Sequence, residues 1–456
     1  MDGGYRIDVP ADVPLPSLRG VAISPTTGAI GVIAYMKHIL LSTNGGDRAT
    51  AYTMSNKLIP LREGYLVTWI DSQRRNHWAL VDLDNDRLVG SGLLGGPCVD
   101  NHCGAALVRV GEHVHAVTGG HHSPFQHYRM HSSQPGRWQH VARINVKGTY
   151  PSLAGDSQGG IHLAYRSPGD RWSLNYSRFQ NGQWTESRAL FAADKPGYIY
   201  WTNGLSTGPD DSLHLVFGNT RTRDDGALLY GASHVVSNNG GQTWRDDNDR
   251  VLPLPSPVFA VPLMIDADNP ERAQSVSDQR GHEQPGPRNL NYHQMILSNP
   301  VVDPNGTVHV VLHNGLTGTA DLMSRSTMGH WTAEPLAAAA TSGIPNGRVH
   351  VQSSLTFLPD GRLRAAMMIE QTEECVWGAP GTSIVLVETT GGGAPEGSVR
   401  VTPTDPGCAH WLPAQPHCAG TFPERMPPLL YTRGVNAGGF GNNKNAVETD
   451  VLLCRT

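Results

Sequence analysis

The sequence is poor in charge and has no long apolar run. Asp, Glu, Lys and Arg make up 16% of its 456 residues, and the formal net charge is −5. A general nucleic-acid-binding surface needs a basic face, which this balance does not supply. No window of eighteen apolar residues free of charge occurs, so we expect no membrane-spanning helix. An anionic ligand would therefore have to be met by a local basic cluster.

Cysteine is too sparse to define a disulfide scaffold, and the sequence shows no export signal. The six cysteines allow fifteen complete pairings and select none. They stand at positions 98, 103, 375, 408, 418 and 454. The opening residues, MDGGYRIDVP, have neither the positive start nor the apolar core of a secretory signal peptide. The sequence by itself therefore indicates no export route.

Turn-forming residues are abundant instead, with 52 glycines and 33 prolines, and they separate short segments of alternating apolar residues. Five such segments follow a Gly or Asp turn, and each is expected to be the second strand of a repeated unit. They are EHVHAVTGG, GGIHLAYRS, DSLHLVFGN, GTVHVVLHNG and GRLRAAMMIE. A glycine shortly before a tryptophan recurs where a third strand would turn into a fourth, at Trp138, Trp184, Trp244 and Trp331.

The spacing of the repeat is typical of a β-propeller. His115 and His162 are 47 residues apart, and His162 and His214 are 52 apart, which gives a period of about 50. The interval from His214 to His309 is nearly double, which indicates an insertion at about residues 250–290.

The two ends of the chain are expected to complete the ring. The C-terminal NAVETDVLLCRT should pair with an N-terminal strand such as AIGVIAYMKH. Blades that close into a ring have only short, protected edges, which suits Gly-rich four-strand units. We predict an all-β chain that forms one seven-bladed β-propeller of four-stranded antiparallel blades over residues 1–456.

Ionisable residues stand at matching places in two successive hairpins of the repeat. The first hairpin has His102 at the start of its first strand and His121 with His122 at the end of its second. The next hairpin has Tyr150 and Arg166 in those places. Because these positions are neighbours across an antiparallel ladder, we expect the side chains to converge on one rim.

The segment SNNGGQTW at 237–244 resembles the Asp-box of sialidases and other BNR-repeat propellers, with Asn239 where Asp is usual. Its physical role is a tight hairpin in which a short polar side chain caps backbone N–H groups and the tryptophan packs between blades. The motif therefore supports the fold and carries no information on activity.

The region from residue 100 to 167 resembles the BNR-4 type seven-bladed propellers, which include ulvan lyases and L-rhamnose-α-1,4-D-glucuronate lyases. The matching elements are DNH at 100–102, GGHHSPFQHYR at 119–129, TYP at 149–151 and YRS at 165–167. The likeness extends more loosely through KPGYIYWTNGL and FGNTRT, over roughly half of the chain. It implies a secreted or periplasmic lyase that acts on an anionic polysaccharide.

The resemblance also implies a catalytic group of His102, His121, Tyr150 and Arg166. The first hairpin is one residue shorter than the family pattern, so His121 and His122 compete for one catalytic position. Motif order favours His121 and leaves His122 to contact the substrate.

The chemistry of such a lyase requires these residue types. The enzyme removes the C5 proton beside a uronate carboxylate and expels the sugar on O4, so the carboxylate charge must be neutralised. Arg166 and His102 are expected to bind it. His121 and Tyr150 are expected to transfer protons, because histidine titrates near neutral pH and a tyrosine, ordinarily at ~10, gains acidity beside a cation. Which of the two is the base depends on the face of the sugar and stays open.

Further residues are expected to bind the substrate. Arg221 occupies the place of Arg166 in the next blade, and Arg348 has a comparable place in a later one. Tyr198, Trp201 and Asn203 form a candidate platform for stacking sugars, with core packing as the alternative.

Metal sites are only weakly indicated, and the lyase chemistry requires no cofactor. Zinc-type ligands gather at Cys408, His410, His417 and Cys418, but their spacing matches no standard finger and the two cysteines could pair instead. The resemblance allows a structural Ca²⁺ in the channel, although no loop has EF-hand spacing.

Our leading hypothesis is a monomeric polysaccharide lyase that cleaves a rhamnose–glucuronate linkage, in algal ulvan or at rhamnose-capped ends of plant arabinogalactan. One alternative is an α-L-rhamnosidase-type hydrolase that uses a separate site on the other face. A sialidase fits less well, because RIDVP at 6–10 is a poor substitute for the Arg-Ile-Pro opening. A non-catalytic carbohydrate-binding propeller is the alternative from another class, since fold alone does not decide activity.

Overall fold

The chain of the computed structural model divides into two units. These units are Met1–Met36 and Lys37–Thr456, and every described strand lies in the second. The described residues are 36–193, 196, 202–222, 228–264, 275–277, 295–314, 319–371, 378–390, 393–435 and 448–456. Within these ranges, no helix has the length and apolar character needed to cross a membrane.

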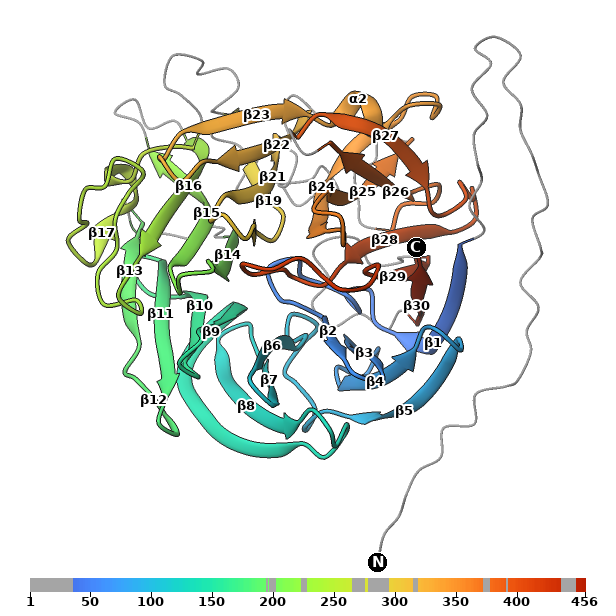
Figure 1. Ribbon diagram of the computed structural model, residues 1–456, viewed down its shortest axis with the longest axis horizontal. Helices are drawn as coiled ribbons and strands as arrows, with labels where there is room; N and C mark the ends of the chain where they lie inside the picture. Colours follow the sequence, from blue (N-terminus) through green and yellow to red (C-terminus); the bar gives the residue numbers. More distant parts are fainter. Residues whose placement is uncertain are drawn as a thin grey trace, which may run out of the picture. The chain divides into compact units, whose positions relative to one another are not determined.

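Antiparallel strands dominate the second unit, and Figure 1 shows its sheets set around a common centre. One sheet has the order β2 (Leu58–Leu61), β3 (Gly64–Ile70), β4 (Asn76–Asp82) and β5 (Arg87–Leu93). Another has the order β14 (Thr202–Thr207), β15 (Leu213–Thr222), β16 (Leu228–Ser237) and β18 (Ser275–Ser277). A third has the order β24 (Arg348–Phe357), β25 (Leu363–Glu370), β26 (Ser383–Thr389) and β27 (Pro395–Arg400).

A fourth sheet has the order β19 (Met295–Leu297), β21 (Val308–Asn314), β22 (Thr319–Arg325) and β23 (Trp331–Pro335), with β20 (Val301–Val302) beside β21. Helical structure in the described residues is confined to η1 (Val258–Ala260) and α2 (Ala337–Ala340). The fifth sheet joins the two ends of the unit, in the order β1 (Lys37–Gly45), β30 (Thr449–Arg455), β29 (Leu429–Gly434) and β28 (Ala409–Ala414).

The longest sheet is continuous because one strand serves two groups of strands. Its first group is β6 (Ala106–Val110), β7 (His113–Thr118) and β8 (Ser123–His131), and its second is β10 (Ile161–Ser167), β11 (Ser173–Gln180), β12 (Gln183–Trp184), β13 (Arg188–Ala192) and β17 (Ser256–Pro257). Strand β9 (Gln139–Gly155) pairs with β8 through its first part and with β10 through its last part. The chain turns between the two pairings, close to Tyr150.

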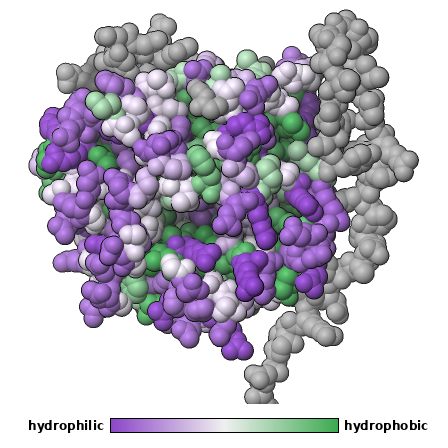
Figure 2. All heavy atoms as spheres, in the orientation of Figure 1, coloured by the Kyte–Doolittle hydropathy of each residue, from purple (hydrophilic) through white to green (hydrophobic). Residues whose placement is uncertain are grey.

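The apolar core lies between successive sheets. One cluster joins β3 and β4 to β29 and β30, for example through Trp69 and Leu453, and another joins β10 and β11 to β14 and β15, through Leu174 and Leu215. Strands packed on both faces are buried at every position, as in GYLVTWI of β3. Polar residues are left for the outside, and Figure 2 shows mainly hydrophilic side chains on the face that it presents.

The structure confirms the predicted repeat. The five repeated segments form β7, β10, β15, β21 and β25, and each follows the first strand of its group in the sheet order. Trp331 begins the fourth strand of its sheet, as the glycine–tryptophan pattern predicts.

The C-terminal strand pairs with an N-terminal one as predicted, but that strand is β1, which shares only Lys37 and His38 with the predicted AIGVIAYMKH. Lys37 of β1 lies opposite Arg455 of β30. Residues 29–35 of the predicted N-terminal strand lie outside the described residues. Of the predicted insertion at 250–290, the described parts contain β17 and β18, which add to the edges of two sheets, and the rest lies outside the described residues.

The predicted Asp-box turn is present. Oδ1 of Asn239 accepts the backbone N–H of Thr243 at 2.9 Å, and Ser237 Oγ accepts that of Gly241 at 3.0 Å. Trp244 is fully buried and packs in the core cluster between the sheets of β11 and β15. The motif is therefore a turn and a packing anchor, as expected.

Candidate active site

The four residues predicted as catalytic come together at neighbouring strand ends. His102 precedes β6, His121 follows β7, and Tyr150 and Arg166 belong to β9 and β10. The ring centroids of His102 and His121 are 4.4 Å apart, and those of His102 and Tyr150 are 6.1 Å apart. The Arg166 guanidinium carbon lies 4.5 Å from the centre of the Tyr150 ring. The hairpin argument thus predicted a real cluster.

The backbone of this cluster adopts the left-handed region that residues other than glycine rarely enter. The φ angles are 47° at His121, 69° at His122 and 60° at Tyr150. Between β9 and β10, the pairing shifts from Ala164 opposite Ser152 to Arg166 opposite Thr149, so Tyr150 lies in a bulge. Such conformations cost about 1–3 kcal/mol each and gather at functional sites, where the surrounding structure holds them.

Asp100 links the two histidines. Its Oδ1 accepts the backbone N–H of His102 at 2.8 Å, and its Oδ2 accepts a hydrogen bond from Nδ1 of His121. Burial by itself raises the pKa of Asp100, but the hydrogen bonds from His102 and the nearby imidazoles lower it to about 2. The carboxylate is therefore charged at neutral pH, and it directs Nε2 of His121 away from itself as a proton acceptor.

Arg48 is a site residue that sequence analysis missed. It is buried, and its Nη1 lies 3.1 Å from Nδ1 of His102 and 3.1 Å from Oδ1 of Asn101. Burial, followed by the charge of Arg48, lowers the pKa of His102 to about 3. Nη1 of Arg48 also lies 2.5 Å from Nε2 of His102. Because a guanidinium only donates, the neutral imidazole accepts from it through Nε2, while its Nδ1 donates to Oδ1 of Asp100 at 3.3 Å. No repeat or motif marks Arg48, since it comes from the turn before β2.

Two aromatic residues complete the site and were also missed. Trp172 lies on Arg166, with the guanidinium carbon 4.8 Å from its ring, so the cation lies against both Trp172 and Tyr150. The ring of Tyr52 meets that of Tyr150 edge-on, with centroids 4.7 Å apart. Both residues come from segments that carry no part of the recognised motifs.

His121 is the most accessible of the four predicted catalytic residues. Its side chain is 30% exposed, whereas Tyr150 and Arg166 are 4% and 2% exposed. His122 and Trp172 are partly exposed beside it, with ring centroids 5.2 Å apart. Burial, followed by the charges of His121 and Arg166, lowers the pKa of His122. A ligand would reach the cluster from this side.

The other residues predicted to bind the substrate do not form one group in the described structure. Asn203 is buried and donates from Nδ2 to the carbonyl oxygen of Tyr150 at 3.1 Å, so it supports the bulge. The backbone of Arg221 lies in β15, opposite Leu229, but its side chain is outside the described part. Arg348 is exposed at the start of β24, opposite Glu370. Tyr198 and Trp201 lie outside the described residues.

The structure does not bring the four predicted zinc ligands together. Within the described ranges, ligating atoms of three residues lie within 4.8 Å of one another only at Asp100, His102 and His121. Cys408, His410, His417 and Cys418 form no such group, and both cysteines are free thiols. At the Asp100 group, the Arg48 guanidinium already faces a ring nitrogen of His102, so the donor set does not fit a cation.

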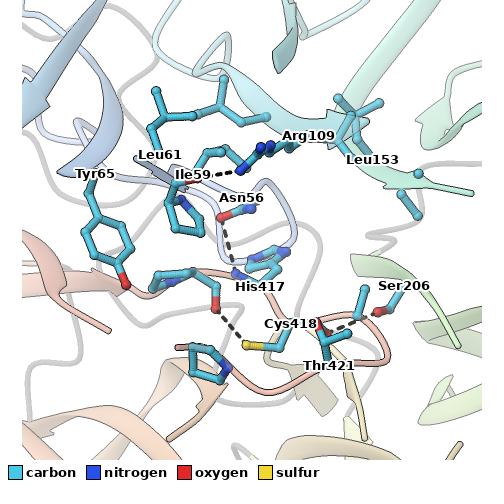
Figure 3. A pocket seen from close by; sticks show the side chains of 18 of the residues that line it. Asn56, Ile59, Leu61, Tyr65, Arg109, Leu153, Ser206, His417, Cys418 and Thr421 are labelled. Carbon is cyan, nitrogen blue, oxygen red and sulfur yellow. Dashed lines mark hydrogen bonds between the residues drawn. The ribbon is translucent and has the colours of Figure 1, made fainter. Parts of the chain in front are cut away.

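Figure 3 shows a pocket of about 700 Å³. It lies at the ends of strands β6 and β9 that are opposite to the histidine cluster. The last residues of β2, β6, β9 and β14 line it, together with the segment from Pro416 to Arg425. Its charged lining residues are Arg62, Arg109, Arg425 and Glu424. The pocket is therefore separate from the histidine cluster and carries a single carboxylate among its described lining residues.

Comparisons with known proteins agree on the fold. A model described as "BNR repeat-containing family member" matches residues 63–339, and no curated protein matches the chain. An ulvan lyase structure bound to -[GlcA(1-4)Rha3S]- has a TM-score of 0.62 at 12% identity, over 92% of this chain and 98% of that one. The structure of polysaccharide lyase Uly1 has a TM-score of 0.54 at 11% identity, over the same shares. At such identity the likeness shows a common fold and leaves activity to the site.

Proposed function

The chain belongs to the BNR repeat-containing family, and from this premise we propose that it is a polysaccharide lyase that cleaves a uronate-containing glycan by β-elimination. The expected substrate is a rhamnose–glucuronate polymer, such as ulvan or the rhamnose-capped ends of arabinogalactan. The observation that carries the proposal is the contact of Arg166 with the Tyr150 ring at 4.5 Å, beside the Asp100–His121 pair. One cluster thus holds a cation, a phenol and an imidazole with a directed acceptor nitrogen.

The first task of this site is to neutralise the uronate carboxylate. His102 is neutral, since its pKa is about 3, so it offers hydrogen bonding and no charge. Positive charge comes from Arg166 and from Arg48 behind His102. The carboxylate is expected to bind beside His122 and Trp172, where Arg166 is nearest, and there the cation stabilises the charge that develops at C5.

The second task is proton transfer. We assign the base to His121, because its Nδ1 is held by Asp100 and its Nε2 faces away as an acceptor. His121 removes the C5 proton, the electron pair forms the C4–C5 double bond, and the C4–O4 bond breaks. Tyr150 gives its proton to the departing O4, and the Arg166 guanidinium over its ring stabilises the negative charge left on the phenol oxygen.

The finer architecture belongs to the same proposal. If the two parts of β9 are assigned to adjacent blades, the sheets form seven blades, most of them with four strands. The chain would then be one propeller domain, acting as a secreted or periplasmic monomer on an anionic glycan.

A rise in ultraviolet absorbance from the unsaturated uronate tests the proposal directly. The protein is incubated with ulvan and, separately, with rhamnose-capped arabinogalactan. Tyr150→Phe and His121→Ala are expected to lower kcat by about 10²–10⁴-fold. Tyr165→Phe is the matched control, because this buried tyrosine of the same hairpin bonds Ser187 and lies outside the cluster.

Two outcomes would reject β-elimination. Release of free rhamnose without absorbance would point to hydrolysis, although the far pocket has one carboxylate where a glycosidase ordinarily uses two. Glycan binding without either product, retained in Tyr150→Phe, would point to a lectin.

A further inference from the structure

Two cysteines bracket the loop that carries Asp100 and His102. The segment reads Cys98-Val-Asp-Asn-His-Cys103. Cys98 is partly exposed, and its neighbour Val99 is 53% exposed, so small reagents can reach this side of the loop. Cys103 is fully buried at the other end of the loop. Neither thiol has a part in the proposed reaction.

The Cys98 thiol lies against the backbone of Cys103. Sγ of Cys98 lies 3.9 Å from the carbonyl oxygen of Cys103. Asn76 holds both ends of the loop, since its Nδ2 lies 3.3 Å from Cys98 Sγ and 3.0 Å from that carbonyl oxygen. This arrangement already holds the pair at close range.

The two thiols differ in pKa and in burial, and thiol–disulfide exchange makes use of both differences. The hydrogen bond from Cys103, with help from Asn76, lowers the pKa of Cys98 against the effect of burial. The same bond, together with burial, raises the pKa of Cys103. A partly exposed sulfur of lowered pKa is suited to attack, and a buried partner beside it is suited to resolve the product.

We propose that Cys98 and Cys103 form a redox site that accepts an intramolecular disulfide from a low-molecular-weight disulfide. The Cys98 thiolate attacks one sulfur of the reagent, which breaks its S–S bond and releases one thiol. Cys103 then gives up its proton to solvent and attacks Cys98 Sγ, and the second thiol leaves. The protein loses two protons and two electrons, and the reagent takes up both and is reduced to two thiols.

The two cysteines flank Asp100 and His102 of the candidate active site in the sequence, and Cys103 contacts this site in space. Sγ of Cys103 is 3.8 Å from Oδ1 of Asp100 and 3.8 Å from the carbonyl oxygen of Gly120, next to His121. The other described thiols differ from Cys98 in their pKa, which burial raises in Cys418, Cys454 and Cys408. The described contacts of their sulfur atoms are to oxygen atoms. Within the described residues, the paired arrangement is therefore peculiar to this loop.

Mass spectrometry of the full chain tests the proposal without any activity assay. The folded protein is treated with glutathione disulfide, alkylated and digested with trypsin, and residues 88–109 then form one peptide that contains both cysteines. The expected product is this peptide without alkyl groups and lighter by two hydrogens. It should form about tenfold faster than any modification of Cys408 or Cys454, and unfolding in denaturant should abolish the difference.

Variants separate the two roles. Cys103→Ser should stop at a glutathione adduct on Cys98, and Cys98→Ser should leave Cys103 unmodified. Cys454→Ser is the control, because this buried thiol contacts the backbone oxygen of Arg455 and should not change the rate. The proposal fails if the wild-type peptide remains doubly alkylated, or if Cys408 and Cys454 oxidise as fast as the pair.

Discussion

Asp100 holds His121 by a hydrogen bond from Nδ1 to its Oδ2, while its Oδ1 accepts the backbone N–H of His102 at 2.8 Å. One buried carboxylate therefore fixes both the direction of one imidazole and the backbone position of the other. A second aspartate–histidine pair occurs in the next hairpin, where Nε2 of His162 lies 3.1 Å from Oδ2 of Asp156, at the other end of the β9–β10 ladder from Arg166. The second pair offers a natural control for the first.

Asp100→Asn should lower kcat by about 10²–10³-fold, because the amide no longer stabilises positive charge on His121 and no longer fixes its tautomer. KM should change little. The measurement is the initial rate of uronate absorbance on whichever of ulvan and rhamnose-capped arabinogalactan the wild-type protein cleaves. Asp156→Asn should lower stability and leave kcat within about twofold of wild type. Equal loss of kcat in both variants would contradict the special role of Asp100.

Arg48→Met should raise the pKa of His102. Arg48 is the main charge that keeps this pKa low after burial, so its removal shifts protonation toward the ordinary value of 6.5. Proton NMR titration of the His102 ring gives the shift directly, and burial alone should still hold the pKa below 6.5. A titration curve unchanged from wild type would show that the guanidinium does not act on this ring.

Asn203→Ala should lower kcat about tenfold with little change in KM, because Tyr150 loses the 3.1 Å hydrogen bond that supports its strained backbone. Asn299 makes the same type of contact in another sheet, where its Nδ2 donates to the carbonyl oxygen of Leu355 at 2.7 Å. Asn299→Ala should therefore cost similar stability without affecting kcat. Urea unfolding and steady-state kinetics on both variants separate support of Tyr150 from general stability.

The free energy of unfolding should fall as the pH is lowered from 6.5 toward 4. Burial lowers the pKa values of His214, His313 and His350 to about 3, so these side chains stay neutral when folded and bind protons when unfolded. The unfolded chain then binds more protons, and each such histidine costs about 1.4 kcal/mol per pH unit in this window. Glu370 has the opposite sign, because burial raises its pKa.

Urea unfolding at pH 7, 6, 5 and 4 measures this dependence. His313→Gln keeps a hydrogen-bonding group near Ser353 Oγ, which lies 2.9 Å from Nε2 of His313, and removes the titration. Its unfolding free energy should depend less steeply on pH than that of wild type. A slope equal to the wild-type slope would mean that His313 protonates in the folded state.

Local patterns in the sequence predict the strands, their repeat and the meeting of His102, His121, Tyr150 and Arg166. These features are local, because alternation with period two, turn residues and hairpin pairing fix which residues face each other across a ladder. The pairing of β30 with β1 also followed from the repeat, since a ring of sheets leaves the two chain ends as the remaining partners.

The surroundings of these residues depend on packing between segments that are far apart in the sequence. Arg48, Tyr52 and Trp172 reach the cluster from segments without a motif, because packing between sheets has no short sequence period. The neutral state of His102 depends on its burial and on Arg48, so it could not be derived from the residue type. The same reason explains why Asn203 supports Tyr150 from inside, and why four zinc-type ligands close in sequence do not meet in space.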